Sequence, residues 1–303
     1  MFIGHAVLAF VMVAAAAVGL GRSRRTALCL GGLAGLFATV PDIDMVFAVA
    51  GLFAGGDAFA MADGFWRAST VVHRGATHSL LVGVPAAVAF GLLGDRSRIA
   101  VTILAGLVVT VGIVTGPLAA GSMAVFGVVG GLLGYLASRW PFSTRDRVAV
   151  AAVGVLTHPF GDVFTGTPPA FFYPLEWTVV ATRVAPFPDP TLDLLLAFGV
   201  EVTVLWAGVA TVAWLTHRSI RGGVDRRAGI GAGYAVAALV LTPPTMAVSY
   251  QFVFSVLALG IVGVVPTRRP LETVDTWTIG VTGLAAITVG WIAYTGTYLL
   301  VGT

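Results

Sequence analysis

Long apolar stretches recur along the whole chain and are separated by short polar segments. A helix that crosses a bilayer needs about 20 mainly apolar residues, and about ten stretches approach this length. They lie at approximately residues 2–21, 27–49, 76–93, 99–116, 119–137, 148–165, 191–215, 228–247, 249–265 and 277–301. Strands of a membrane barrel would alternate apolar and polar residues, and these stretches do not. The pattern therefore predicts an all-α fold, a polytopic transmembrane bundle of about ten helices.

Composition supports a membrane location. The chain of 303 residues is 57% hydrophobic and only 10% charged, whereas a soluble domain carries about 25% charged residues. Its net charge of +3 comes from Arg residues scattered in short loops, because the sequence contains no Lys. We interpret these residues as topology signals and not as a nucleic-acid-binding surface. The single Cys29 lies inside an apolar stretch, which excludes a disulfide within the chain and a Cys-based metal site.

The Arg-rich loops orient the chain in the membrane, since such loops face the cytoplasm. They contain Arg22, Arg24, Arg25, Arg96, Arg98, Arg139, Arg145, Arg147, Arg218, Arg221, Arg226, Arg227, Arg268 and Arg269. With these loops inside, Arg67, Arg74 and Arg183 fall outside and both termini lie on the outer face. The same threading brings a set of His and Asp residues to the outer ends of their helices: His5, Asp42, Asp44, His73, His78, His158 and Asp162. We expect a multi-pass protein of the cell membrane whose site faces outward.

Two outer connections, residues of about 50–75 and 166–190, are long enough to form a lid or a lipid-facing platform. They carry several of the acidic residues, namely Asp57, Asp63, Glu176, Asp189 and Asp193.

The first polar motif in an apolar stretch is Pro41-Asp42-Ile43-Asp44. A charged group inside a membrane helix costs about 2.5–3.5 kcal/mol and is therefore usually paired or functional. Pro41 disturbs a helix around it, which would let two carboxylates at i and i+2 converge on a metal ion. The alternative is a carboxylate that caps a helix break.

The second motif is the segment 73–79, His-Arg-Gly-Ala-Thr-His-Ser. His73 and His78 suit a loop that runs into a helix start, where Thr77 or Ser79 can cap the helix. Arg74 has the planar fork that recognises phosphate or carboxylate groups. Taken alone, the segment could also be a set of interfacial polar residues.

The third motif is His158 and Asp162, which share one helix face at i and i+4 and could present two metal ligands. Pro159 would loosen the hydrogen bonding next to His158. His5, near the start of the first stretch, is either a further ligand or an interfacial histidine. Glu201 could line the site or bond a neighbouring helix.

With these motifs in this order, the chain resembles the LexA-regulated inner-membrane metal-dependent hydrolase family (YdjM-like proteins). The matching pieces are His5 and the segments 41–44, 73–79, 158–166 and 172–177. The resemblance covers roughly residues 1–180 and implies a membrane-embedded hydrolase with His and Asp ligands to a metal. Residues 159–161 depart from the more aliphatic filling that is usual in the family. We therefore expect a metal-dependent hydrolase region over residues 1–190 and additional helices of unassigned role over residues 191–303.

We expect His73, His78, His158 and Asp162 to supply most ligands of a divalent cation, with zinc favoured by the imidazole content. Asp42 and Asp44 either complete a second metal site or act as general base, and Arg74 holds a phosphate. His5 completes the predicted ligand set. A site at the outer interface reaches lipid head groups, so the expected substrate is a membrane lipid or another amphiphilic phosphoester. The alternatives are a cation transporter and a non-catalytic scaffold with a structural metal.

Overall fold

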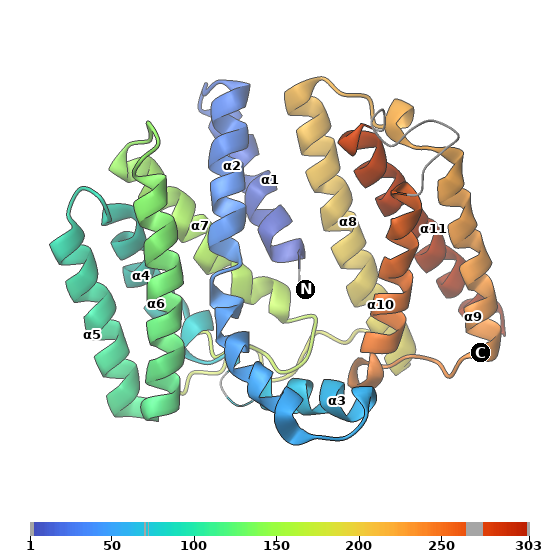
Figure 1. Cartoon of the computed structure of the whole chain (residues 1–303), viewed down its shortest axis with the longest axis horizontal. Coiled ribbons are helices and arrows are strands. Elements are labelled where there is room, and N and C mark those ends of the chain that lie inside the picture. Colours follow the sequence, from blue (N-terminus) through green and yellow to red (C-terminus); the bar gives the residue numbers. More distant parts are fainter. Residues whose placement is uncertain (1–2, 70, 72, 265–274, 302–303) are drawn as a thin grey trace. The chain divides into compact units, whose positions relative to one another are not determined.

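The computed structural model describes residues 3–69, 71, 73–264 and 275–301 (Figure 1). These residues form helices and loops without a strand, which confirms the all-α fold. The chain divides into two compact units, residues 1–183 and 184–303, where the sequence predicted a boundary after residue 190. All the candidate ligands lie in the first unit.

The first unit contains seven α-helices and two 3-10 helices. They are α1 (Gly4–Gly19), α2 (Arg24–Ala38), η1 (Pro41–Ala54), α3 (Ala58–Ser69), η2 (Ala76–His78), α4 (Leu80–Leu92), α5 (Ser97–Thr115), α6 (Pro117–Ala137) and α7 (Thr144–Asp162). Helix α7 packs against α1, α2 and α4, so it forms the centre of this unit. Helix α3 lies across the direction of the long helices at one end of the unit (Figure 1).

Local sequence signals explain where the helices of this unit begin and end. Ser79 caps α4 by accepting hydrogen bonds from the backbone amides of Leu81 and Val82. Ser143 and Asp146 form a capping box at the start of α7. Gly116 separates α5 from α6. Its φ of 107° is a backbone conformation that glycine adopts without strain, and Pro117 then starts α6.

A glycine contact brings α7 close to α2. A Cβ placed on Gly154 would lie 2.6 Å from the carbonyl oxygen of Ala34, so the two backbones could not approach this closely with any other residue there. The close approach puts the end of α2 beside His158, one turn further along α7. Helix–helix packing thus builds one wall of the site described below.

Buried Arg147 ties the opposite end of α7 to its neighbours. Its guanidinium donates to Asp95 Oδ2 at 2.6 Å and to the carbonyl oxygens of Gly91 and Phe142 at 3.2 and 2.9 Å. The hydroxyl of Thr144 and then Arg147 lower the pKa of Asp95. Sequence analysis treated Arg147 as a topology signal only, and the structure adds this structural role. Fifteen residues of helix, about 22 Å, separate Arg147 from Asp162.

The predicted count of about ten membrane spans is not confirmed. Among the described residues, four helices are long and apolar enough to cross a membrane, namely α5, α6, α8 (Pro190–Thr216) and α11 (Thr276–Val301). A fifth span forms if α2 and η1, bent by 42° to each other, cross together. The expectation of about ten spans is not supported, because several apolar stretches are divided. The stretch 76–93, for example, becomes a 3-10 turn followed by the 13-residue helix α4.

The second unit contains α8, α11 and a set of shorter elements. These are η3 (Arg221–Gly223), η4 (Arg226–Tyr234), α9 (Ala235–Val240), η5 (Met246–Val248), α10 (Tyr250–Ala258) and η6 (Leu259–Gly263). Aromatic side chains, including Phe198, Phe252, Tyr294 and Tyr298, form its core. The predicted loop residues Arg268 and Arg269 lie outside the described residues, as does the end of the stretch 249–265.

Candidate metal centre

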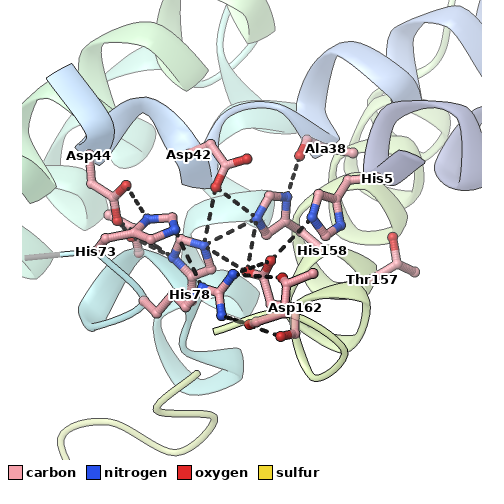
Figure 2. Close-up of polar contacts among 12 residues, drawn as sticks. His5, Ala38, Asp42, Asp44, His73, His78, Thr157, His158 and Asp162 are labelled. Atoms are coloured by element: carbon pink, nitrogen blue, oxygen red, sulfur yellow. Dashed lines mark hydrogen bonds and ion pairs between the residues drawn. The ribbon is translucent and has the colours of Figure 1, made fainter. Parts of the chain in front are cut away.

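Four of the predicted ligands meet in one buried group at the end of α7 (Figure 2). Asp42 comes from the first turn of η1, His78 from the end of η2, and His158 and Asp162 from the last turns of α7. One donor atom from each of these residues lies within 4.8 Å of every other. Segments far apart in the sequence therefore converge on a single point.

The donor atoms have the spacing of a tetrahedral site. His158 Nε2 lies 3.1 Å from His78 Nε2, 3.2 Å from Asp42 Oδ1 and 3.6 Å from Asp162 Oδ2. His78 Nε2 lies 3.5 Å from Asp42 Oδ1 and 3.3 Å from Asp162 Oδ2. Bonds of about 2.0–2.2 Å to zinc place tetrahedral ligands about 3.3–3.6 Å apart. These distances fit one divalent cation without rearrangement of the side chains.

Asp162 Oδ2 gives an independent test of this fit. The atom is buried and accepts no hydrogen bond from the described residues, and its nearest polar neighbours are the imidazole nitrogens of His78 and His158 at 3.3 and 3.6 Å. A buried carboxylate oxygen without a partner is costly and rare in folded proteins. A cation bound between the four donors would satisfy this oxygen, so the residues present fit a metal ion.

His158 is oriented toward the group by the end of α2. Its Nδ1 lies 2.6 Å from the carbonyl oxygen of Ala38, to which it donates a hydrogen bond, so its Nε2 is directed at the other donors. Such a carbonyl partner commonly fixes the tautomer of a metal-binding histidine. Helix α7 continues through Pro159, so His158 and Asp162 keep their positions on one face.

His78 is oriented by a chain of hydrogen bonds. The Thr77 hydroxyl donates to Asp44 Oδ2 at 2.7 Å. Thr77 Oγ1 is thereby left to accept a hydrogen bond from His78 Nδ1 at 2.9 Å. This carboxylate–hydroxyl–imidazole chain directs His78 Nε2 toward the four-donor group. Sequence analysis considered Thr77 only as a helix cap, a function that Ser79 performs instead.

Without a cation, the carboxylates around His78 favour its protonated form. Burial alone would lower the pKa of His78, but contacts with Asp162 and Asp42 outweigh burial and raise the pKa to about 9. A cation must displace this proton to bind Nε2. Cation affinity should therefore fall as pH decreases below about 9.

Asp44, His73 and His78 form a second group of donors within 4.8 Å of one another. His73 Nδ1 lies 2.9 Å from Asp44 Oδ1. Of the two carboxylates that the sequence offered for a second metal site, this group contains Asp44 and not Asp42. Asp44 and His78 Nδ1 are already bonded to Thr77, which favours a supporting role for Asp44 and His73 around His78.

His5 lies beside the four-donor group and outside it. Its ring stacks on that of His158 with centroids 3.8 Å apart, and its Nε2 lies 3.3 Å from Asp162 Oδ1. Asp162 Oδ1 contacts His5 and Arg74, whereas Oδ2 is the oxygen that belongs to the four-donor group. Neither donor group includes His5 or Glu201 among the described residues.

Arg74 makes contacts that differ from the predicted phosphate contact. Its Nη2 donates to Asp162 Oδ1 at 3.1 Å and to the Thr165 hydroxyl at 2.9 Å. Its Nη1 bonds the carbonyl oxygens of Asp162, Thr165 and Thr167, and its Nε donates to His73 Nε2 at 3.4 Å. A guanidinium has five N–H groups, and each has an acceptor within the protein. Arg74 therefore holds Asp162 and the loop after α7 in place.

The Thr77 hydroxyl can be tested by its replacement with valine, which keeps the side-chain shape. We expect Thr77→Val to lower divalent-cation affinity by about 10–100-fold, because the support of His78 is lost. Competition with a chromophoric chelator measures this affinity. Thr157→Val is the matched control, since Thr157 lies beside His158 (Figure 2) but bonds the Val153 carbonyl of its own helix. Equal affinities of the two variants would contradict the assignment.

The substitution Arg74→Lys distinguishes support of Asp162 from phosphate binding as the role of Arg74. It keeps the positive charge and removes the planar guanidinium. We expect weaker cation binding and a loss of about 1.5–3 kcal/mol in unfolding free energy, because bonds from a charged donor are lost. Exposed Arg67, which forms an ion pair at 3.1 Å with Asp63 four residues earlier and lies outside the four-donor group, offers Arg67→Lys as control. An unchanged cation affinity combined with weaker phosphate binding would support the clamp instead.

Comparison with known proteins identifies the family. Neither curated proteins nor solved structures yield a match. The family model of the YdjM inner membrane protein matches residues 1–264, which extends beyond the residues 1–180 on which the resemblance rested and includes helices of the second unit. The chain is therefore a multi-pass membrane protein that belongs to the YdjM inner membrane protein family.

Proposed function

We propose that this protein is a metal-dependent hydrolase of the membrane. Asp42, His78, His158 and Asp162 hold the divalent cation, for which zinc fits the ligand set of two imidazoles and two carboxylates. Asp44 and His73 support His78. This assignment keeps four of the seven predicted ligands, gives Asp44 and His73 a supporting role, leaves His5 outside the group, and moves Arg74 from substrate contact to support of Asp162.

The observation that carries the proposal is the exposure of one ligand. The side chain of Asp42 is 30% exposed, whereas those of His78, His158 and Asp162 are 0–3% exposed. A structural metal site is closed on all sides, while a catalytic site keeps a position for water or substrate. Water reaches the group at Asp42, which favours catalysis over a scaffold role.

Asp42 has two oxygens with different surroundings. Its Oδ1 faces His78 and His158, whereas none of the described residues bonds Oδ2 (Figure 2). A bound divalent cation lowers the pKa of its water toward about 7 and so supplies hydroxide at neutral pH. With Oδ1 among the cation donors, Asp42 Oδ2 would remain available to act as a general base.

The four-donor group and the ion pairs of Arg22 and Arg147 lie at opposite ends of α7. Arg147 and the 3.0 Å ion pair between Arg22 and Asp146 mark the start of α7, and Asp162 marks its end. Arginine-rich loops face the cytoplasm. This separation supports a site on the outer side, where a membrane lipid or another amphiphilic phosphoester is the proposed substrate.

The cation site and the activity can be tested together on the detergent-purified protein. We expect about one equivalent of zinc in wild type, and little in His158→Ala or Asp162→Ala. Asp42→Asn should slow hydrolysis of a short-chain phospholipid by about 100-fold or more, because it removes both a carboxylate ligand and the proposed general base. His217, in the second unit, provides the control His217→Ala.

A folded wild type that binds neither added zinc nor added manganese would refute the hydrolase proposal. Cation binding without turnover, together with cation uptake into proteoliposomes, would favour a transporter.

The orientation can be tested by cysteine labelling after Cys29→Ala removes the native thiol. Thr178 and Arg25 are both exposed, the first in the loop after α7 and the second at the start of α2. We expect an impermeant maleimide to label Thr178→Cys in intact spheroplasts and Arg25→Cys only after permeabilisation. The reverse pattern would place the site on the cytoplasmic side.

A further inference from the structure

A second feature of the first unit is a pocket beside the metal centre. It has a volume of about 580 Å³ and is lined by residues 71 and 73–76, by the turn between α5 and α6, and by the loop segment 167–181. None of the four donors of the metal centre lines it. Its size is typical of small-molecule sites.

The walls of this pocket are fixed by hydrogen bonds. The Tyr173 hydroxyl bonds the Thr115 hydroxyl at 2.5 Å, which ties the loop to the end of α5. Ser79 Oγ donates to the Tyr173 carbonyl at 2.8 Å, and the Leu80 amide donates to the Phe171 carbonyl at 2.8 Å. The loop that forms this wall of the pocket is therefore held in place by hydrogen bonds to α4 and α5.

The charged groups of the pocket leave a negative balance. Arg74 is neutralised by Asp162 at 3.1 Å, and His73 has both ring nitrogens engaged, Nδ1 with Asp44 at 2.9 Å and Nε2 with Arg74. Glu176 lines the pocket and makes no ion pair with any of the described residues. Since the donors of Arg74 are occupied, an anionic group would meet one unpaired carboxylate and no free guanidinium.

The remaining lining is mainly apolar and includes an exposed aromatic ring. Trp177 follows Glu176 directly and is 68% exposed, and Leu175 and Val179 lie nearby in the same wall. A carboxylate beside a tryptophan is the pair of groups that recognises an ammonium ion, through charge attraction and cation–π contact. The apolar wall provides a surface for hydrocarbon attached to such an ion.

We propose that this pocket binds the ammonium head of a membrane amphiphile, with Glu176 as its counter-ion and Trp177 as its aromatic partner. The free carboxylate and the occupied guanidinium exclude an anionic head group. The proposal goes beyond the hydrolase function, and binding requires no metal. Two sources share this chemistry: a zwitterionic phospholipid and a simple alkylammonium ion.

Binding can be measured by calorimetry on the full chain in maltoside micelles, with chelator present. The probes are dioctanoyl phosphatidylethanolamine, decyltrimethylammonium and, as the anionic counterpart, dioctanoyl phosphatidylglycerol. We expect the ammonium probe to bind more tightly than phosphatidylglycerol, and Glu176→Gln or Trp177→Leu to weaken it by about tenfold, as loss of a cation–π or ionic contact does. Asp63→Asn removes an exposed carboxylate outside the pocket and should change nothing.

The probes also identify the source of the ammonium group. Binding of both ammonium probes supports the proposal and shows that a simple amphiphile suffices, and binding of phosphatidylethanolamine alone supports it with a phospholipid as the occupant. Equal binding of phosphatidylglycerol, or unchanged affinity in Glu176→Gln, would overturn it. Because the assay uses neither metal nor turnover, failure here leaves the hydrolase proposal intact, and failure of hydrolysis leaves this result intact.

Discussion

A carboxylate withdrawn from water must be compensated, and in this protein the constraint is strongest at Asp162. The desolvation penalty of a buried ion is several kcal/mol, and the side chain of Asp162 is only 3% exposed. Arg74 compensates Oδ1, while Oδ2 faces two imidazoles and the proposed cation. The surrounding loop conforms to this requirement, since Arg74 adopts a left-handed φ of 66° to reach Asp162 and the carbonyls beyond it. The ligand, the arginine and the loop after α7 thus form one interdependent unit.

The sequence located the donors better than it located their supports. His158 and Asp162 were predictable because helical spacing alone brings i and i+4 together, and Asp42 because Pro41 marks a break. Arg74 was assigned to phosphate, since its target depends on how a distant loop closes over it. Thr77 and the Ala38 carbonyl carry no distinguishing pattern, the latter because every residue has a carbonyl. The predicted count of about ten spans is not confirmed for a related reason: apolar content does not distinguish a spanning helix from a shorter apolar helix such as α4.

The metal centre and the neighbouring pocket are linked through shared residues. His73 and Arg74 line the pocket on one side and support the ligands on the other. The charge of Arg74 is used by Asp162, and both ring nitrogens of His73 are bonded within the protein, so neither residue offers a free positive group to the pocket. If both proposals hold, a phosphoester that also carries an ammonium group would suit the pair of sites better than an anionic lipid. Selectivity for such a lipid would then follow from the pairing of Arg74 with Asp162, which leaves Glu176 as the unpaired charge of the pocket.

The break between α2 and η1 has a consequence for how the site is assembled. A helix leaves its last carbonyls without partners, and Pro41 has no N–H to offer the Ala38 carbonyl three residues earlier. That carbonyl is therefore available to His158, and the same interruption starts the turn that carries Asp42. One interruption of the backbone thus supplies both a ligand and the acceptor that orients a second ligand on another helix. A continuous helix here would remove both at once, so the four-donor group depends on the break in this segment.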